Sequence, residues 1–300
     1  MINNTQKGAL YILLSAFLFG SYGIWSVLLG KEFGVFFQGY VRSGLVLLIL
    51  IPFCYFTNKW VKIKKSDYKS FYWCCCFAIF TQAPLYYAFQ NSGIGISSLI
   101  FFAVSLVTSY FVGAFLLSEK LNRIKVISLF LAIIGLSFIF YTSLGVFSVF
   151  ALCMAGLNGV SSGGEVSTTK LIPQKFSAIQ ISIVIWFTIF ITHLPMSLLF
   201  GEKQIKPELS TEWVSMICFA IAGVVAFYLV VEGYKYVEAS IGGLIGLLEI
   251  VFAIIFGVLV FKESLALSII FGSVIILISA SLPHLIKDSQ QPNKKLCNIE

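Results

Sequence analysis

Long apolar runs recur from one end of the chain to the other, and the segments between them hold most of the charged residues. Ten runs can be distinguished, at 8–29, 35–56, 70–90, 96–117, 124–141, 147–170, 177–200, 212–234, 239–261 and 265–286. Each is close to the length of about 20 residues that crosses a bilayer as a helix. Because a segment in hydrocarbon must satisfy its own backbone hydrogen bonds, the pattern predicts an all-α polytopic membrane protein with ten transmembrane helices.

The distribution of positive charge predicts how these spans are oriented. Ten spans place both termini on the same side of the membrane. With cytoplasmic termini, 15 of the 20 Lys and Arg residues lie in cytoplasmic segments, four lie outside, and Arg42 lies within the second span. Since cytoplasmic segments carry an excess of Lys and Arg, we expect a multi-pass protein of the cell inner membrane with both termini in the cytoplasm. This bias accounts for the net charge of +7 without any nucleic-acid partner.

Residue patterns typical of enzymes and metal sites are not found in the sequence. Cys74, Cys75 and Cys76 are consecutive, so on a helix they point about 100° apart and cannot converge on one tetrahedral ion. No metalloprotease or nucleophile-elbow motif occurs, and no soluble segment is long enough for a nucleotide-binding domain. We therefore expect no enzymatic activity, no metal and no cofactor.

A short internal repeat divides the chain into two halves. Residues 113–121 (GAFLLSEKL) match residues 257–265 (GVLVFKESL) in the glycine, the glutamate and the final leucine, with an offset of 144 residues. The predicted units are 1–143 with spans 1–5, 144–286 with spans 6–10, and a cytoplasmic tail at 287–300. Because five is odd, the second unit is expected to be inverted relative to the first, an architecture of secondary transporters.

Several motifs carry a resemblance to a known family. They are the repeated ending with Glu119 and Glu263, Arg42 within YVRSG at 40–44, and the Leu248-Glu249 pair. In these features the chain resembles the EamA family of the drug/metabolite transporter superfamily. The resemblance implies a small-molecule carrier with a central cavity, and export is the more common direction in that family. One departure is that Leu106 and Ile250 stand where the family often has a proline, which argues against proline kinks in spans 4 and 9.

Polar residues inside the spans are the candidate site residues, because such groups are costly in hydrocarbon and need a reason to be there. Glu249 lies close to the middle of span 9, and its repeat mate is Ser105. We expect it to bind substrate and to couple transport to protons; the alternative is a protonated carboxyl that is hydrogen-bonded between helices. Pro84, between Gln82 and Tyr86, is expected to kink span 3. The predicted substrate-binding residues are Tyr22, Gln82, Tyr86, Asn158, Tyr228 and Glu249.

Four other charged residues are expected to have mainly structural roles. Arg42 is expected to extend outward or to tie helix ends together, with anion binding as the alternative. Glu119 and Glu263 lie at helix junctions, where a carboxylate favours the N-terminal dipole of the next helix. Glu165 is near the cytoplasmic end of span 6 and is expected to pair with Lys170.

These observations together predict a secondary transporter for a small organic metabolite, such as an amino acid. The transporter would move this metabolite across the inner membrane by alternating access, and the expected direction is export. The alternative is a lipid or amphiphile flippase of related architecture. The expected partners are the substrate, membrane lipid and protons, and the expected state is a monomer or a homodimer.

Overall fold

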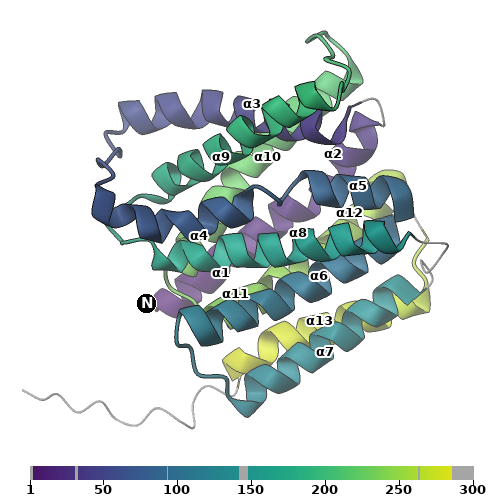
Figure 1. Cartoon of the computed structure of the whole chain (residues 1–300). Helices are drawn as coiled ribbons and strands as arrows, with labels where there is room; N and C mark the ends of the chain where they lie inside the picture. The colour runs from purple at the N-terminus through teal and green to yellow at the C-terminus, as the bar shows by residue number, and fades with distance from the viewer. Residues whose placement is uncertain (1–2, 31–32, 93, 142–147, 263, 286–300) are drawn as a thin grey trace, which may run out of the picture.

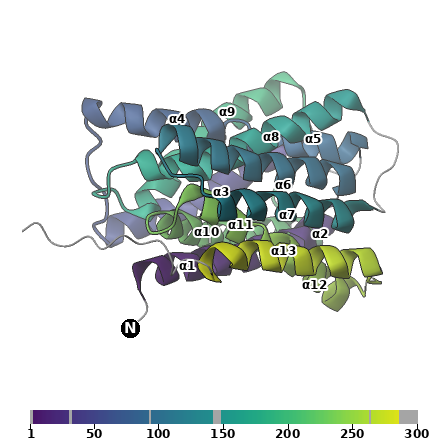
Figure 2. The same ribbon diagram turned by 90° about the horizontal axis from the view of Figure 1, so that it is seen from below.

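The computed structural model describes residues 3–30, 33–92, 94–141, 148–262 and 264–285, and the regular structure in them is helical. The helices lie side by side as a bundle with roughly parallel axes (Figures 1 and 2). The first half contains α1 (Asn4–Gly20), α2 (Tyr22–Leu29), α3 (Val35–Phe56), α4 (Tyr68–Ala78), α5 (Ala83–Ser92), α6 (Ile94–Phe111) and α7 (Arg123–Phe140). The second half contains α8 (Val149–Thr168), α9 (Ala178–Leu199), α10 (Thr211–Tyr234), α11 (Ala239–Gly246), α12 (Leu248–Phe261) and α13 (Leu267–Leu285). Short helical turns η1 (Lys65–Asp67) and η4 (Thr169–Leu171) and a π-helical turn η2 (Val112–Leu116) connect them.

Seven of the described helical segments are long and apolar enough to cross a membrane. They are Asn4–Leu29, Val35–Phe56, Ile94–Leu116, Arg123–Phe140, Ala178–Leu199, Thr211–Tyr234 and Ala239–Phe261. The other three predicted spans also contain helix, as the separated pair α4 and α5, as the polar α8, and as α13. The structure therefore shows an all-helical protein with multiple membrane-spanning helices, and the count of ten spans stays a prediction.

Polar residues just before the apolar runs start many of the helices. Asn122 Oδ1 accepts the amide of Lys125 at 2.9 Å, and Ser177 Oγ accepts the amide of Gln180 at 3.2 Å. Ser148 and Ser210 cap α8 and α10 in the same way. Such caps satisfy amides that the first helical turn leaves without partners, and they explain why the helices begin where the apolar runs begin.

Three of the predicted spans are broken near their middle. α1 gives way to α2 at Ser21, α4 and α5 are separated by residues 79–82, and α11 gives way to α12 at Leu247. The break in span 9 occurs although Ile250 replaces the family's proline, in a segment that glycines at 242, 243 and 246 weaken. The kink expected from Pro84 takes a different form, because Pro84 lies in the first turn of α5, where proline is tolerated.

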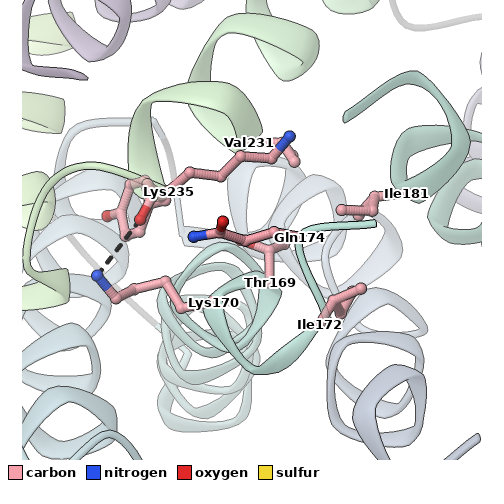
Figure 3. Close-up of a pocket in the computed structure, with 8 residues that line it drawn as sticks. Thr169, Lys170, Ile172, Gln174, Ile181, Val231 and Lys235 are labelled. Carbon is pink, nitrogen blue, oxygen red and sulfur yellow. Dashed lines mark hydrogen bonds between the residues drawn. The ribbon is translucent and has the colours of Figure 1, made fainter. Parts of the chain in front are cut away.

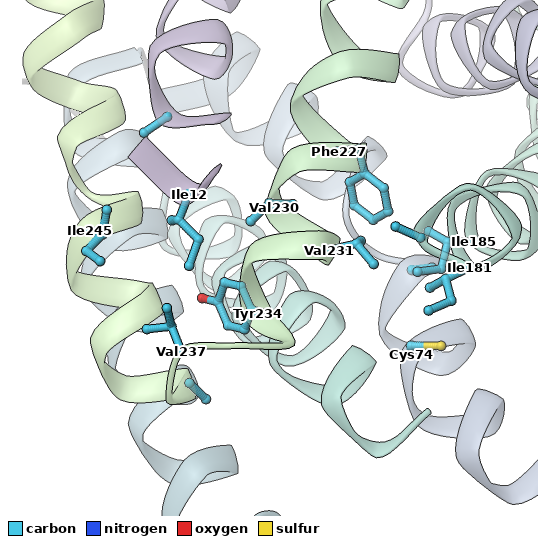
Figure 4. Packing of buried hydrophobic residues seen from close by; sticks show 14 of the residues in the cluster. Ile12, Cys74, Ile181, Ile185, Phe227, Val230, Val231, Tyr234, Val237 and Ile245 are labelled. Atoms are coloured by element: carbon cyan, nitrogen blue, oxygen red, sulfur yellow. The ribbon is translucent and has the colours of Figure 1, made fainter. Parts of the chain in front are cut away.

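Contacts between the two halves hold the bundle together. α1 packs against α10 and against α11 and α12, while α8 packs against α4 and α5 and against α6. α3 packs against α9, and α7 packs against α13. Near the middle of the bundle, Ile12, Phe227 and Val231 belong to a buried apolar cluster that joins α1, α9, α10 and α11 (Figure 4). Each half therefore buries its apolar faces mainly against the other half.

The connections gather at the two ends of the bundle (Figure 1). At the end that holds the N-terminus, Lys175 Nζ lies 2.7 Å from Asp67 Oδ1 and links η1 to the segment before α9. This ion pair and the amide of Lys64 hold the pKa of Asp67 below its usual value. Because the folded-state pKa is lowered, the stabilisation is present above about pH 4 and is lost as the pH falls through that lower pKa.

Gly135→Ala is expected to lower the melting temperature of the purified protein by several degrees. A Cβ at Gly135 would lie 2.9 Å from the carbonyl oxygen of Gly272 and 2.8 Å from Ile276 Cγ1, so α7 and α13 would have to separate. Overpacking of this kind costs about 1–3 kcal/mol, which exceeds the gain of up to about 1 kcal/mol in helix propensity. Gly246→Ala is the matched control, because nothing lies within 4 Å of its added Cβ. Equal thermal stability of the two variants would contradict this packing argument.

Candidate functional site

A cavity of about 570 Å³ lies inside the bundle, between helices of both halves. It is lined from α1, α2, α5, α6, α8, α10, α11 and α12, among others. All three helix breaks reach its wall, at Tyr22, at Gln82 and at Leu247. The cavity lies within the range of about 300–1,000 Å³ that is typical of small-molecule sites. Broken helices that meet at an internal cavity are a recurrent feature of transporter substrate sites.

The structure brings five of the six predicted substrate-binding residues to the wall of this cavity. They are Tyr22, Gln82, Tyr86, Asn158 and Glu249. The sixth, Tyr228, does not line the cavity; it is partly buried and packs against the apolar cluster. The substrate-binding roles of all six residues stay predictions. For the five residues at the cavity, the prediction is now supported by their common location.

Arg42 lies at the cavity and not in the position that the sequence suggested. The residue is 3% exposed and lines the cavity, so the side chain does not extend outward; its expected role in tying helix ends together stays a prediction. One of its terminal nitrogens donates a hydrogen bond to Gln82 Oε1. The same oxygen accepts the hydroxyl of Tyr86 at 3.2 Å. This chain of polar contacts links α3 to the break before α5.

Aromatic rings surround the guanidinium of Arg42. Its Cζ lies 4.3 Å from the ring centroid of Phe219, 5.5 Å from that of Trp186 and 5.6 Å from that of Tyr22. A cation within about 6 Å of an aromatic centroid is attracted by the ring quadrupole, and more strongly where water is excluded. The rings thus lower the cost of holding the positive charge in the interior.

Two carboxylates also face the cavity. Glu249 is in the first turn of α12, and its carboxylate forms no ion pair within the described residues. Glu165 is 5% exposed, and its Oε1 has no partner in that same part of the chain. The expected pairing of Glu165 with Lys170 is wrong, because the ammonium of Lys170 extends past the end of α8 to a different carboxylate.

Asn158 supports the break between α4 and α5. It is fully buried, and its Nδ2 donates to the carbonyl oxygen of Phe80 at 3.0 Å. Ser162 Oγ donates to Asn158 Oδ1 at 3.3 Å. Since residues 79–82 leave the helix, the carbonyl of Phe80 needs a partner, and Asn158 provides it. Asn158 therefore positions the Gln82 segment from the facing helix α8.

A polar network closes one end of the bundle. Glu119 Oε1 accepts the amide of Ala239 at 2.7 Å, and its Oε2 lies 3.4 Å from the amide of Ser240. Lys170 Nζ lies 3.6 Å from Glu119 Oε1 and donates to the carbonyl oxygen of Val237 at 2.5 Å. The carboxylate thus caps α11, a helix of the other half. The prediction that Glu119 interacts with the start of the next helix, α7, is wrong, because Asn122 caps α7. Glu263 lies outside the described residues.

The end of α10 contributes to the same closure. Lys170 Nζ also donates to the carbonyl oxygen of Tyr234 at 3.3 Å (Figure 3). The side chain of Tyr234 reaches the large cavity and lies against Gly242, where an added Cβ would be 2.7 Å from its Cζ. A small cavity of about 80 Å³ lies beside this contact. At the opposite end the large cavity reaches Val27, Ile94 and Phe261, near the ends of α2, α6 and α12.

No group of three or more His, Cys, Asp or Glu side chains in the described part of the chain is arranged to hold a metal ion. The cavity instead offers one guanidinium, two carboxylates, and amide, hydroxyl and aromatic groups. These groups can bind an organic ion by charge, hydrogen bonding and ring contact.

Comparison with known proteins identifies the family. No curated protein sequence matches the chain. A solved structure titled "Crystal structure of protein" is similar in fold, with a TM-score of 0.78 over 94% of this chain and 99% of that chain, at 13% sequence identity. The EamA-like transporter family matches the chain twice, at residues 6–141 and at residues 149–282. The chain therefore belongs to the EamA-like transporter family, of which it contains two consecutive repeats.

Proposed function

We propose that this protein is a secondary transporter that moves a small organic metabolite, such as an amino acid, across the inner membrane by alternating access. The observation that carries the proposal is the cavity of about 570 Å³ at three helix breaks, with ionisable groups on its wall. Ionisable groups that line a cavity inside a membrane protein mark a substrate or ion pathway.

The pattern of helix contacts supports two repeats related by a pseudo-twofold axis, as two inverted halves would be. If α1 and α2 of the first half correspond to α8 of the second, then α4 and α5 correspond to α10. The contact of α1 with α10 then has its counterpart in the contact of α8 with α4 and α5. The contact of α1 with α11 and α12 likewise has its counterpart in that of α8 with α6. Two halves that exchange such conformations provide alternating access to a site between them.

The two ends of the cavity support an outward-facing state. The end closed by Glu119, Lys170 and Tyr234 is the end that carries the N-terminus and the lysine-rich segment 57–67. By the positive-inside rule this end is cytoplasmic. The cavity then extends toward the outer ends of α2 and α12, from which an exported substrate would leave.

The transport proposal is tested by uptake into proteoliposomes. The purified protein is reconstituted and exposed to a panel of labelled amino acids and related metabolites, with and without a proton gradient. We expect saturable transport of at least one compound, well above the rate of protein-free liposomes. Scrambling of a fluorescent phospholipid without metabolite transport would overturn the proposal in favour of a lipid flippase.

The inverted topology is tested separately by labelling. Lys62→Cys in the segment before η1 is expected to react only from the cytoplasmic side. Lys206→Cys, in the segment between α9 and α10, is expected to react only from outside. Labelling of both cysteines from the same side would contradict the inverted arrangement of the repeats.

A further inference from the structure

Within the described residues, Arg42 lacks the anionic partner that a buried arginine needs. Among the described residues, no aspartate or glutamate oxygen lies within 4.0 Å of its guanidinium. Its hydrogen-bond partner there is the neutral amide of Gln82, and its Nε has no partner. A guanidinium carries five N–H donors in a planar fork. Since buried charges are normally paired, this arrangement leaves a place for an anion.

The surroundings of Arg42 define what kind of anion fits. Phe219, Trp186 and Tyr22 place aromatic rings around the guanidinium. Such walls suit a planar group bound in the guanidinium plane with an apolar body beside it, as bidentate binding of a carboxylate requires. Arg42 is the one basic residue on the cavity wall within the described chain, and no lysine lines it. A dianionic phosphate would keep an uncompensated charge, whereas a monoanionic carboxylate would not.

We propose that Arg42 binds the carboxylate of the transported substrate and thereby selects carboxylate-bearing metabolites. The proposal rests on the proposed transport function, because it places the substrate in the same cavity. Glu165 and Glu249, which face this cavity without a cationic partner in the described residues, accept a positively charged group of the same molecule. A zwitterion presents its carboxylate to Arg42 and its cationic group to one of these two carboxylates, and the aromatic rings contact its hydrocarbon part.

Binding of paired probes to the purified full chain tests this assignment. The pair is 3-phenylpropionate and its neutral amide, 3-phenylpropionamide, which differ in charge and are nearly equal in size. The readout is tryptophan fluorescence, since Trp186 lies 5.5 Å from the Arg42 guanidinium. A Trp186→Phe variant identifies the part of the signal that comes from this site. We expect the wild type to bind the carboxylate about tenfold or more tightly than the amide.

Substitution of Arg42 is expected to remove this preference. Arg42→Gln should bind both probes with similar, weak affinity. Arg42→Lys keeps the charge without the planar fork, so it should retain an intermediate preference for the carboxylate. This variant provides the test if Arg42→Gln does not fold. Arg123→Gln is the matched control, because the second arginine of the chain is exposed at the start of α7. It should bind both probes as the wild type does.

Three results would overturn the assignment. They are equal binding of carboxylate and amide by the wild type, no binding of either probe, and a full carboxylate preference in Arg42→Gln. A different result would overturn the transport proposal. In that case the carboxylate probe still binds to the protein, but the proteoliposomes take up no metabolite. Carboxylate binding without transport would therefore leave Arg42 as an anion site in a protein of another function.

Discussion

Glu249→Gln is expected to abolish gradient-driven accumulation of substrate while exchange of substrate for substrate continues. Glu249 faces the cavity, and no cation of the described residues lies within ion-pair distance of it. Its charge can therefore be neutralised in two ways, by a proton or by a cationic group of the substrate. If these two compete for one carboxyl, alternating access exchanges a proton for a substrate.

The glutamine variant separates coupling from binding. Its amide keeps the size and much of the hydrogen-bonding geometry of a protonated carboxyl, but it cannot release a proton. Accumulation should fall to the level reached without a gradient, and the pH dependence of transport should disappear. Counterflow of labelled substrate, driven by unlabelled substrate alone, should remain measurable in the same proteoliposomes.

A matched substitution tests whether the effect belongs to the cavity. Glu208 lies in the exposed segment before α10, and Glu208→Gln should keep both accumulation and its pH dependence. Wild-type accumulation and an unchanged pH profile in Glu249→Gln would remove the coupling role. The carboxyl would then be a substrate contact or a structural group, and the driving force would act elsewhere.

The helices were predictable because the bilayer imposes a length and a composition on each span. The breaks at Ser21 and Leu247 were not, because neither position has a proline and the local pattern continues through both. Their location follows from packing around the cavity, to which residues distant in sequence contribute. At the third break, between α4 and α5, Asn158 holds the Phe80 carbonyl from another helix and is an example of such a contact.

The location of the site residues within helical spans was predictable, but rotation about the helix axis was not. Arg42 and Tyr228 each lie well inside a span, and the sequence alone does not show which neighbour each will face. The structure turns Arg42 to the cavity and Tyr228 to the apolar cluster. A sequence feature that could have placed Arg42 at the cavity is its position inside a span. The free-energy cost of a charged side chain in hydrocarbon by itself favours a functional role.

Partners across the two halves were also beyond the reach of the sequence. Glu165 and Lys170 are five residues apart, and proximity in sequence favoured their pairing. In the structure Lys170 instead meets Glu119, and Glu119 caps α11, more than a hundred residues away. Long-range capping of this kind depends on how the two halves pack against each other. A short sequence motif does not show which distant helix its carboxylate will cap.

Glu119→Ala is expected to destabilise the protein strongly. The substitution leaves the amides of Ala239 and Ser240 without their acceptor and leaves Lys170 without its carboxylate. The Glu119 side chain is 7% exposed and that of Lys170 is 19% exposed, so water replaces these partners poorly. Removing one member of a buried ion pair typically costs about 3–5 kcal/mol. A lower melting temperature of the purified protein measures the effect.

The adjacent ion pair between Lys125 and Glu238 supplies the control for Glu119→Ala. Its two charged atoms are 2.5 Å apart; the Lys125 side chain is 5% exposed, whereas that of Glu238 is 48% exposed. Water can replace the Glu238 carboxylate, and Lys125 Nζ keeps its hydrogen bond to the carbonyl oxygen of Lys120 at 2.7 Å, so Glu238→Ala should lower the melting temperature less than Glu119→Ala. Glu119→Gln keeps an oxygen acceptor for the start of α11 and should fall between the two alanine variants. Equal small losses for Glu119→Ala and Glu238→Ala would show that the closed end of the cavity is held by apolar packing around Tyr234 and not by the buried carboxylate.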